Sequence, residues 1–506
     1  MTKPAVLVID VGTTNVKTSL FDFTCRPIDL VSRSHQAADL AVAPRGERLW
    51  NLIKESVPAL LRNNSDCRVA AVGVTGLMHA VIPLDRKGVV IPLPAAGNTV
   101  RRCFDEIARD IGVDGIFQTT GSRLDVTSVP PQLLAWRREC PSEFDRIGTV
   151  LPVKDFVRYR LTGALATDEI DACGAMLFDL RRRCWDPGLV SYCGLRLEAL
   201  PPILHCTDPA GSIAPQAAAH LGIPEGTPIA VGGGDDIEII GSGARTSEQV
   251  CEHVGSTGSF LMPALTPRTD PTRRLELYPA TVQNEWVLGG SCSNVSRALD
   301  WFLLSSAYGG DNGIAWKTLG GELAASLETL DFHRPYFLPY LFGERAPLWN
   351  PDLSAQWREL RSSHRPSDLL LSAVEGICFS LRNILMAYKD MGLEIKVVYS
   401  SGGFNQLGAQ RLRASVYGKP IRRVRGVDPT SFAACAISLC SLGELHEPSE
   451  AVDWLEFEPD VEPEPAWQAA LEDRFGSFLD YTKDAQPAPR RPQPPSDVEP
   501  CEDRKC

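Results

Sequence analysis

VLVIDVGTTNVKTSLFD, residues 6–22, is the stretch that decides how this chain folds. An apolar run ends at Asp10, a Gly12-Thr13-Thr14 turn follows, and an alternating segment then ends at Asp22. This pattern predicts a β-hairpin. Such a turn can offer backbone N–H groups and two hydroxyls to a phosphate, with Asp10 placed to hold a hydrated metal ion. Taken alone, the stretch fits an ordinary hairpin equally well.

A second hairpin of the same design is expected in the middle of the chain. An apolar strand at 228–231 runs into three glycines and the acids Asp235 and Asp236. The segment 249–254 then precedes a turn made of Gly255-Ser256-Thr257-Gly258-Ser259. A repeat of this kind at a spacing of about 240 residues indicates two related halves rather than a short-period array. The boundary between them is expected near residues 241–250.

Strands and helices alternate along both halves, which is typical of an α/β protein. Buried strands are expected at 69–74, 81–85 and 396–400. Helical spacing of apolar residues predicts helices at 47–62, 103–112, 131–138, 155–161, 295–308, 366–391, 407–417 and 431–441. From residue 485 the chain is rich in proline, and we expect this tail, 485–506, to be disordered.

Length and composition restrict the classes of function. A chain of 506 residues has room for about two to four domains. The net charge of −12, with no long basic run, disfavours nucleic acid or an anionic membrane as a partner. No apolar run approaches the roughly 18–20 residues of a membrane span, and the N-terminus lacks a signal-peptide core. Fifteen cysteines without a C-x-x-C pair fit reduced thiols, so a cytoplasmic location is expected.

The candidate functional residues match the needs of phosphoryl transfer. That reaction requires donors around the phosphates, a magnesium ion held by carboxylate, and a base aimed at the acceptor hydroxyl. Two Gly/Ser/Thr turns could grip a polyphosphate from opposite halves, and Asp10 could hold the metal through water. Asp235, after three glycines, could approach a substrate closely. The Gly402-Gly403 turn could let a flat base lie against the backbone.

Each candidate also has an ordinary structural explanation. A Gly402-Gly403 turn between a strand and a helix usually has no further role. Asp235 and Asp236 could cap a helix. His79 could be a core histidine bonded to a carbonyl, and a structural ion pair is the favoured interpretation of Arg345. The combination is more specific than any of its members.

That combination resembles the FGGY family of carbohydrate kinases, which includes xylulokinases, glycerol kinases and gluconate kinases. The similarity spans about residues 5–445. It rests on these motifs: Asp10-Val11-Gly12-Thr13-Thr14 with Lys17, Gly76-Leu77-Met78-His79, Tyr159-Arg160-Leu161-Thr162-Gly163, Gly232-Gly233-Gly234-Asp235, Gly255-Ser256-Thr257-Gly258-Ser259, Leu338-Pro339-Tyr340-Leu341-Phe342-Gly343-Glu344-Arg345-Ala346-Pro347, and Gly402-Gly403.

The resemblance implies two ribonuclease-H-like domains, as in actin and hexokinase, with ATP and Mg²⁺ bound in the cleft between them. The N-terminal domain, 1–245, would bind the sugar, and the C-terminal domain, 246–484, the nucleotide. Asp235 would act as the catalytic base and Asp10 would bind the metal. Sugar contacts would come from Met78, His79, Asn98, Arg101, Asp235 and Asp236. Nucleotide contacts would come from Gly12, Thr13, Thr14, Lys17, Gly255, Ser256, Thr257, Gly258, Ser259, Gly402, Gly403 and Asn405.

Several positions depart from the pattern of xylulokinases, and most lie in the expected sugar pocket. Thr99 replaces an acid, Gly97 replaces a large aromatic residue, and Leu77 stands where glutamine is common. The segment from Asp235 to Gly241 is one residue shorter than is typical, which leaves Asp235 and Asp236 both open as the base.

The expected function is therefore ATP-dependent phosphorylation of a small sugar. A ketopentose such as xylulose or a related polyol is the leading acceptor. A glycerol- or tetritol-type kinase, a sugar-acid kinase, and a catalytically inactive sugar- or nucleotide-binding regulator remain alternatives. The oligomeric state stays open, with a homodimer as one option.

Overall fold

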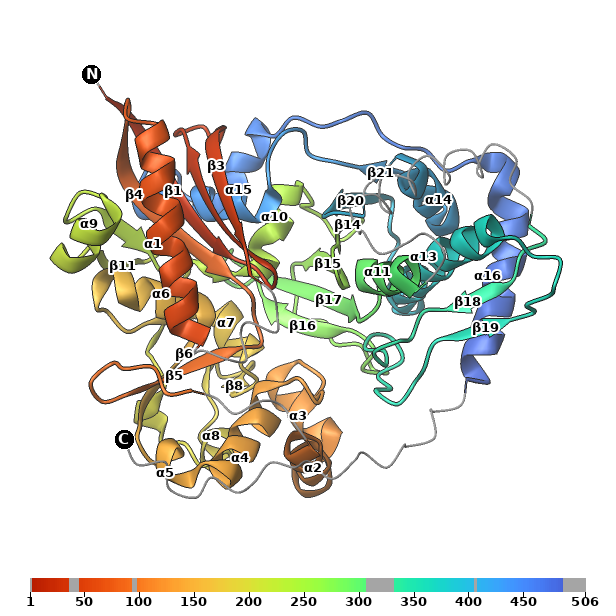
Figure 1. The fold of residues 1–506 in the computed structure, drawn as a ribbon, viewed down its shortest axis with the longest axis horizontal. Coiled ribbons are helices and arrows are strands. Elements are labelled where there is room, and N and C mark those ends of the chain that lie inside the picture. Colours follow the sequence, from red (N-terminus) through yellow and green to blue (C-terminus); the bar gives the residue numbers. More distant parts are fainter. Residues whose placement is uncertain (1, 36–44, 93–97, 306–331, 405–406, 486–506) are drawn as a thin grey trace.

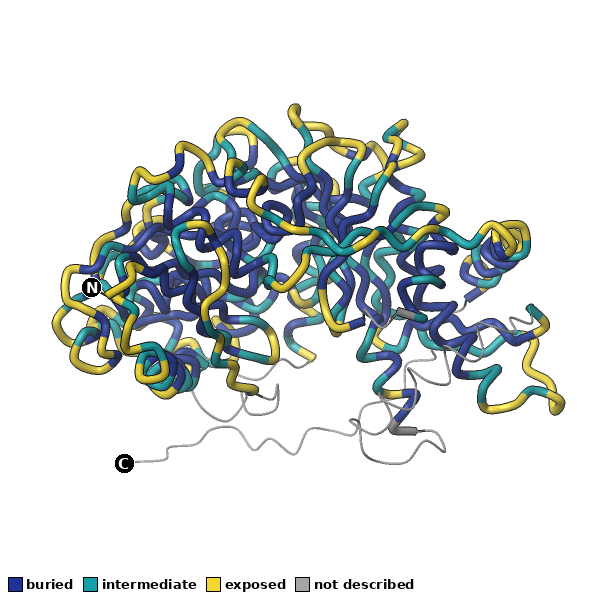
Figure 2. Tube along the Cα trace, turned by 90° about the horizontal axis from the view of Figure 1, so that it is seen from above, coloured by how far each residue is buried: buried dark blue, intermediate teal, exposed yellow. Residues whose placement is uncertain are grey.

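The computed structural model describes residues 2–35, 45–92, 98–305, 332–404 and 407–485. Two lobes lie side by side, each built around a twisted sheet with helices on its faces (Figure 1). Buried segments occupy the centre of each lobe and exposed segments lie at the periphery (Figure 2). This is the two-domain α/β architecture that the two hairpins predicted.

The first sheet has the opening hairpin near its centre. Its path runs in the order β11-β12-β4-β1-β2-β3, and a short strand, β13, also pairs with β4. β1 pairs antiparallel with β2 and parallel with β4, so that Asp10 lies opposite both Lys17 and Thr75. The strands are β1 Lys3–Val11, β2 Asn15–Phe21, β3 Pro27–Ser34, β4 Cys67–Gly76, β11 Pro209–Ser212, β12 Pro228–Ala230 and β13 Gly233–Gly234.

The second sheet repeats the design of the first. It runs β16-β17-β15-β14-β20-β21, and β14 pairs antiparallel with β15 and parallel with β20. Each sheet thus places one hairpin beside one parallel strand, which confirms the two related halves. The strands are β14 Gln249–Val254, β15 Gly258–Ala264, β16 Glu276–Pro279, β17 Trp286–Cys292, β20 Val397–Ser401 and β21 Ile421–Arg422.

Most expected helices form with small shifts at their ends. The exception is the helix expected at 103–112: α2 begins at Asn98 and ends at Ile107, residues Ala108–Gly112 form a π-helical segment, and α3 follows. No residue of Ala108–Gly112 is buried, so packing does not hold this segment in a regular α-helix. The longer helices are α1 Arg45–Asn63, α2 Asn98–Ile107, α3 Val113–Thr120, α4 Val129–Glu139, α6 Val153–Thr162, α9 Pro215–Leu221, α11 Ser296–Ser305, α13 Pro366–Asp390, α14 Leu407–Tyr417, α15 Pro429–Ser441 and α16 Gln468–Lys483.

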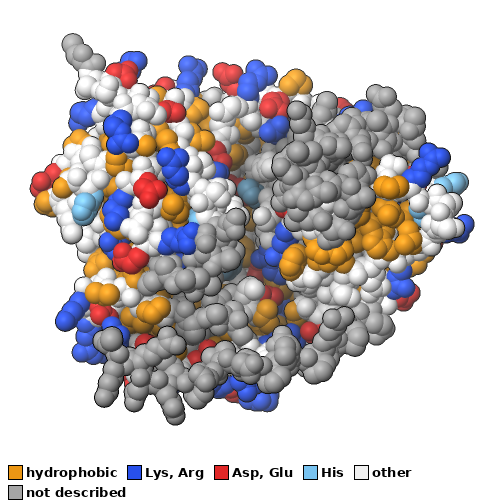
Figure 3. Space-filling view, in the orientation of Figure 1, with side chains coloured by type: hydrophobic (Ala, Val, Ile, Leu, Met, Phe, Trp, Pro, Cys, Tyr) orange, Lys and Arg blue, Asp and Glu red, His pale blue; other side chains and the backbone are white. Residues whose placement is uncertain are grey.

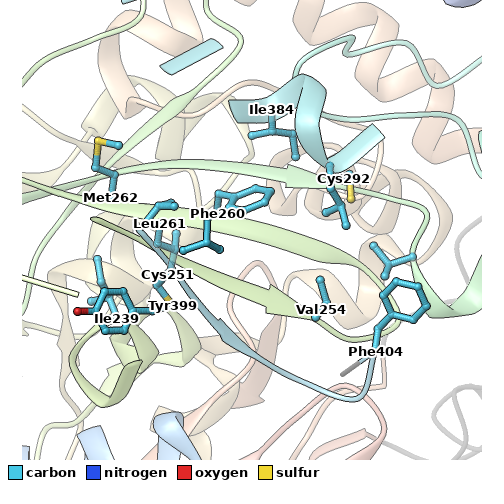
Figure 4. Packing of buried hydrophobic residues seen from close by; sticks show 14 of the residues in the cluster. Ile239, Cys251, Val254, Phe260, Leu261, Met262, Cys292, Ile384, Tyr399 and Phe404 are labelled. Atoms are coloured by element: carbon cyan, nitrogen blue, oxygen red, sulfur yellow. The ribbon is translucent and has the colours of Figure 1, made fainter. Parts of the chain in front are cut away.

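The helix α13 is the core element of the second lobe. Its length and composition would allow it to cross a membrane, but 78% of its most apolar window is buried inside the protein. The Tyr388 hydroxyl donates to the carbonyls of Phe260 and Leu288, which attaches the helix to β15 and β17. Ile384 lies over the same sheet near Cys292 (Figure 4). These contacts identify α13 as a core helix.

The helix α15 belongs to the first lobe in space although it comes late in the chain. It packs against β1 and β4 of the first sheet. A Cβ atom on Gly73 of β4 would lie 2.5 Å from Ser438 Oγ, so the helix approaches the strand closely. It also crosses the short helix α10, Glu238–Ser242, where a Cβ on Gly241 would lie 1.9 Å from the Pro429 carbonyl oxygen. The linear division at residue 245 therefore stays a prediction.

Candidate active site

The hollow between the lobes contains basic and histidine side chains (Figure 3). Lys17, on β2, bonds Asp428 at 2.7 Å and lies 3.6 Å from Asp10. Asp428 is brought there by α15, whose first turn it caps by accepting from the Ser431 N–H. Burial raises the pKa of Asp10 to about 7, and the neighbouring carboxylates of Asp428 and Asp235 add to the effect. Asp10 and Asp428, far apart in the sequence, thus meet at Lys17, and Asp235 lies close enough to Asp10 to influence it.

The first turn holds its predicted residues at the surface. The Gly12 N–H donates to the Asn15 carbonyl at 2.9 Å, which closes the turn. Thr13 and Thr14 are exposed. The Thr14 carbonyl accepts from the His35 N–H at 2.8 Å, which connects the turn to the end of β3. Hydroxyls and backbone groups of this turn are therefore accessible to a phosphate.

Glycines bring Asp235 against the neighbouring strand. Gly232 has a φ of +76°, and a Cβ there would lie 2.1 Å from the Val74 carbonyl oxygen. A Cβ on Gly234 would lie 2.4 Å from Met78 Cγ. Asp235 Oδ1 then accepts from the Met78 N–H at 3.2 Å. Any larger residue at these two glycines would displace Asp235 from the predicted sugar-binding segment.

The environment of Asp235 makes it a stronger base than an ordinary aspartate. Burial raises its pKa to about 6, and the nearby carboxylate of Glu238 contributes in the same direction. The pKa of Asp236 is also raised, first by burial and then by Asp235 and Glu238. Of the two, the carboxylate of Asp235 is the one joined to the Met78 backbone.

A buried lysine supports the strand that leads to Asp235, and sequence analysis did not find it. Lys154 Nζ lies 2.6 Å from Asp155, 2.8 Å from Asp168 and 3.1 Å from Asp171. The same ammonium donates to the Val231 carbonyl at 3.4 Å. This lysine pairs with three carboxylates that would otherwise suit a metal ion.

Asp10 fits a hydrated magnesium ion better than that acidic cluster does. Lys154 already occupies the centre of the cluster, and Arg158 bonds Asp155 at 2.9 Å. Asp10 is instead one carboxylate beside an exposed turn, where water and phosphate oxygens could complete the coordination. Magnesium usually binds in this way, through one or two carboxylates together with water and substrate phosphates.

Met78 and His79, the predicted sugar contacts, lie in the segment that is bonded to Asp235. His79 has a φ of +59°, a strained conformation that is often found at functional sites. Its Nδ1 lies 3.0 Å from the Gly174 carbonyl, which can only accept, so Nδ1 carries the proton and Nε2 is an acceptor. Burial and the nearby charge of Arg345 together lower the pKa of His79 to about 4, so the ring is neutral at neutral pH. The bond from Nδ1 to the Gly174 carbonyl leaves Nε2 as an acceptor, so His79 could still contact a substrate hydroxyl.

The predicted sugar contacts Asn98 and Arg101 lie on α2, and Arg101 is engaged in ion pairs. Asn98 is exposed at the start of α2. Arg101 pairs with Asp105 at 3.3 Å and makes a two-pronged pair with Asp352 of the other lobe, at 3.4 and 3.3 Å. A sugar contact from Arg101 would require that pair to open, so this role stays a prediction. Gly97 and Asn405 lie outside the described residues.

The second turn is braced by the start of α11. The Gly255 N–H donates to the Thr257 carbonyl at 3.0 Å, and the Gly255 carbonyl accepts from Ser296 N and Oγ. Ser256 is exposed, and Ser259 is partly buried. A Cβ on Gly258 would lie 2.7 Å from Leu381 Cδ2, so this glycine is needed for packing. The turn therefore presents its first residues to the hollow.

Gly402 and Gly403 differ in what they require. Gly402 has a φ of +93°, and a Cβ there would lie 2.5 Å from the Val254 carbonyl oxygen. No described atom lies within 4 Å of a Cβ built on Gly403. The first glycine is thus needed by the backbone, and the nucleotide contact expected at the second stays a prediction.

Two further features were missed or misjudged from the sequence. Glu238 and His253 form an ion pair across the lobes, at 3.0 Å, beside Asp235. Arg345, which we expected in a structural ion pair, forms none within 4 Å of an acidic residue in the described ranges; its guanidinium donates to the Cys292 carbonyl at 3.3 Å. These contacts join residues far apart in the sequence, and no local pattern indicates them.

Comparison with known proteins agrees with this geometry. The N-terminal domain model of the FGGY family of carbohydrate kinases matches residues 5–239, and the C-terminal domain model matches residues 254–436. A gluconokinase from Bacillus licheniformis is 23% identical over 455 residues, covering 87% of this chain and 88% of that protein. A xylulose kinase from Escherichia coli is 27% identical over 404 residues, covering 78% and 81%.

Solved structures show the same fold. A gluconate kinase from Lactobacillus acidophilus superposes with a TM-score of 0.85 at 22% identity, covering 95% of this chain and 98% of that one. A glycerol kinase from Plasmodium falciparum with ADP has a TM-score of 0.81 at 16% identity, covering 96% and 98%. With both domain models matched along the chain, this protein belongs to the FGGY family of carbohydrate kinases.

Proposed function

We propose that this kinase transfers the γ-phosphoryl group of ATP to a hydroxyl of a small ketose, a ketopentose such as xylulose or a related polyol. The observation that carries the proposal is the placement of Asp235. Its carboxylate has a raised pKa, is joined to the Met78 backbone at 3.2 Å, and lies within electrostatic reach of Asp10. A base is thereby set between a predicted sugar segment and a predicted phosphate turn.

The reaction follows from these positions. Asp235 accepts the proton of the attacking sugar hydroxyl while the oxygen of that hydroxyl bonds to the γ-phosphorus. The bond from the γ-phosphorus to the bridging oxygen of the β-phosphate breaks, which releases ADP. Lys17 and the turns at 12–14 and 255–259 hold the phosphates. Asp10 would hold Mg²⁺, which supplies charge neutralisation for the phosphate oxygens. Sugar contacts are assigned to Met78, His79 and Asp236.

The proposal also covers the adenine site, the cellular location and the partner of the enzyme. The adenine moiety is assigned to the surface at Gly402 and Gly403. A cytoplasmic location is supported by the cysteines in the described ranges, none of which forms a disulfide. The proposed partner is a small-molecule sugar rather than nucleic acid.

A coupled assay of ADP formation with ketopentoses, pentitols, erythritol, glycerol and sugar acids tests the proposal. We expect turnover with a ketopentose or a related polyol and a loss of about 10²- to 10⁴-fold in kcat for Asp235→Asn, because a general base contributes rate on this scale. Binding of ATP should survive in that variant. Asp453→Asn changes an exposed acid and serves as the control.

Two results would contradict the proposal. Full activity of Asp235→Asn would remove the assigned base. ATP binding without turnover of any tested sugar would favour the inactive-regulator alternative.

A sugar acid is the second candidate acceptor, and Arg345 favours it. Its guanidinium is within electrostatic reach of His79 and pairs with no acidic residue of the described ranges. A substrate carboxylate could take that position, since arginine binds carboxylates well. If the acceptor is a sugar acid, Arg345→Met should raise KM for it at least about tenfold while leaving KM for ATP unchanged. Turnover of neutral sugars alone in the screen would exclude this candidate.

A further inference from the structure

His253 stands at the edge of the phosphate-binding hollow with one ring nitrogen unused. Its Nδ1 lies 3.0 Å from Glu238 Oε2 and 3.1 Å from Ser401 Oγ. About two-fifths of the side chain, 41%, is exposed, whereas Glu238 is 7% exposed. Nε2 makes no hydrogen bond to a described residue. The ring is therefore held firmly at one nitrogen and open at the other.

The open nitrogen lies beside the second turn. His253 comes two residues before Gly255 on β14, and a Cβ built on Gly255 would lie 3.0 Å from His253 Nε2. Along β14, Glu252 points to the other side, where it bonds Arg413 and Tyr417 in the core. Because successive side chains of a strand alternate, His253 faces the hollow.

The imidazole of His253 also lies near residues that the proposed reaction already uses. Asp235 and Lys17, which lie in the first lobe, are both within electrostatic reach of His253. The ring thus lies among the base, the lysine of the first turn and the start of the second turn. An anion that spans the two turns would pass next to Nε2.

We propose that His253, held in place by Glu238, binds the transferring phosphoryl group by donating its Nε2–H. This inference rests on the proposed phosphoryl transfer and adds one protein contact to the γ-phosphoryl group, which faces the acceptor hydroxyl. The Glu238 carboxylate raises the pKa of the histidine to about 9, so the imidazolium is present at neutral pH. A charged donor aimed at developing negative charge stabilises the transition state.

Two substitutions separate this role from a structural one. Asparagine places an amide near the position of Nδ1, so His253→Asn keeps a donor toward Glu238 and removes the donor at Nε2. Glutamine reaches the position of Nε2, so His253→Gln keeps a neutral donor toward the hollow and weakens the pair with Glu238. If His253 binds the phosphoryl group, Asn should be the more damaging change. If the ion pair only joins the lobes, Gln should be as damaging or worse.

The primary measurement is the affinity of the purified protein for β,γ-methylene-ATP and for ADP, by calorimetry with Mg²⁺ and without sugar. We expect His253→Asn to weaken binding of the ATP analogue about 10- to 100-fold with little change for ADP, since one charge-assisted hydrogen bond to the terminal phosphate is lost. His253→Gln should lose less. His220→Gln, on the exposed end of α9, should match the unchanged protein. Thermal melting of each variant checks folding.

The outcomes are distinct. An unchanged ratio of the two affinities in His253→Asn would overturn the role of His253, as would equal losses for both nucleotides accompanied by a lower melting temperature. If the unchanged protein binds the ATP analogue but phosphorylates none of the sugars screened, the proposed acceptor fails while the ratio still tests His253. If it binds neither nucleotide, the proposed phosphoryl transfer itself fails.

Discussion

At the scale of single residues, the site depends on charges that burial brings together. Asp235 is a stronger base than an exposed aspartate because it is desolvated and lies near Glu238. His79 is neutral and His253 is charged at neutral pH, with pKa values of about 4 and 9. The two histidines therefore differ in charge, which suits His79 to the proposed role of an acceptor and His253 to that of a charged donor.

The pH dependence of the reaction follows from the raised pKa of Asp235. Protonated Asp235 cannot accept the hydroxyl proton, so kcat/KM for the sugar should fall as the pH drops through about 6. The neutral His79 and the charged His253 titrate outside this range. The measurement is a pH profile at saturating ATP and Mg²⁺.

Titration of Asp10 is the competing explanation for this fall in kcat/KM, the acid limb of the pH profile, because the pKa of Asp10 is also raised, to about 7. A limb that belongs to Asp10 would shift to lower pH as the Mg²⁺ concentration rises, since the ion favours the carboxylate. A limb that belongs to Asp235 should respond much less. An acid limb near pH 4 would contradict the assignment to Asp235.

At the scale of elements, the crossing of α10 and α15 organises the site. α10 carries Glu238 and follows Asp235, whereas α15 begins just after Asp428. The two helices meet with almost no space at Gly241, where a built Cβ would lie 1.9 Å from the Pro429 carbonyl oxygen. A shift of α10 would therefore move Glu238 and Asp235, and a shift of α15 would move Asp428, the partner of Lys17.

Gly241→Ala should damage stability and activity together. The added methyl group meets backbone rather than a flexible side chain, so one helix must move, at a cost of about 1–3 kcal/mol or more. Melting temperature and kcat should both fall. Gly476→Ala is a matched control, because Gly476 also lies in a helix but has open space around a built Cβ. That variant should be neutral or stabilised by up to about 1 kcal/mol; equal behaviour of the two would contradict the close crossing.

At the scale of the whole molecule, the second lobe is stabilised by a buried charge cluster. Glu375 of α13 bonds Arg474 of α16 at 2.6 Å and Arg334 at 2.5 Å. Arg474 also donates to the carbonyls of Phe332, Arg334 and Pro335. A helix near the end of the chain is thereby attached to the core helix that supports the second sheet.

Arg474→Ala should destabilise this lobe by about 3–5 kcal/mol, because it leaves a buried carboxylate with one partner fewer. Urea unfolding followed by tryptophan fluorescence measures the change. Lys483→Ala, which removes an exposed ion pair with Asp480 from the same helix, should cost less than about 1 kcal/mol. Similar losses in both variants would show that the cluster adds no more than a surface pair.

Local patterns were sufficient for much of this protein. The two hairpins, the helices that cover the sheets and the position of Asp235 all follow from apolar periodicity and glycine placement over short stretches. Glycine at 232 and 234 is itself a sign that a backbone or side chain approaches closely. The alternation of strands and helices was enough to predict the α/β class and its two halves.

The contacts that tune the site were decided only by the tertiary structure. Lys17 meets Asp428, and Glu238 meets His253, because the two sheets and α15 bring distant segments together. Arg345 has no acidic partner among the described residues, because folding places its guanidinium at the Cys292 carbonyl. Hydrophobic periodicity is set by neighbours along the chain, whereas the pairing and the pKa of a charged group depend on what folding places around it. The sequence by itself determined the hairpin at 6–22 and the glycine run that leads to Asp235, the proposed base, and the packing of the lobes decided which charges surround them.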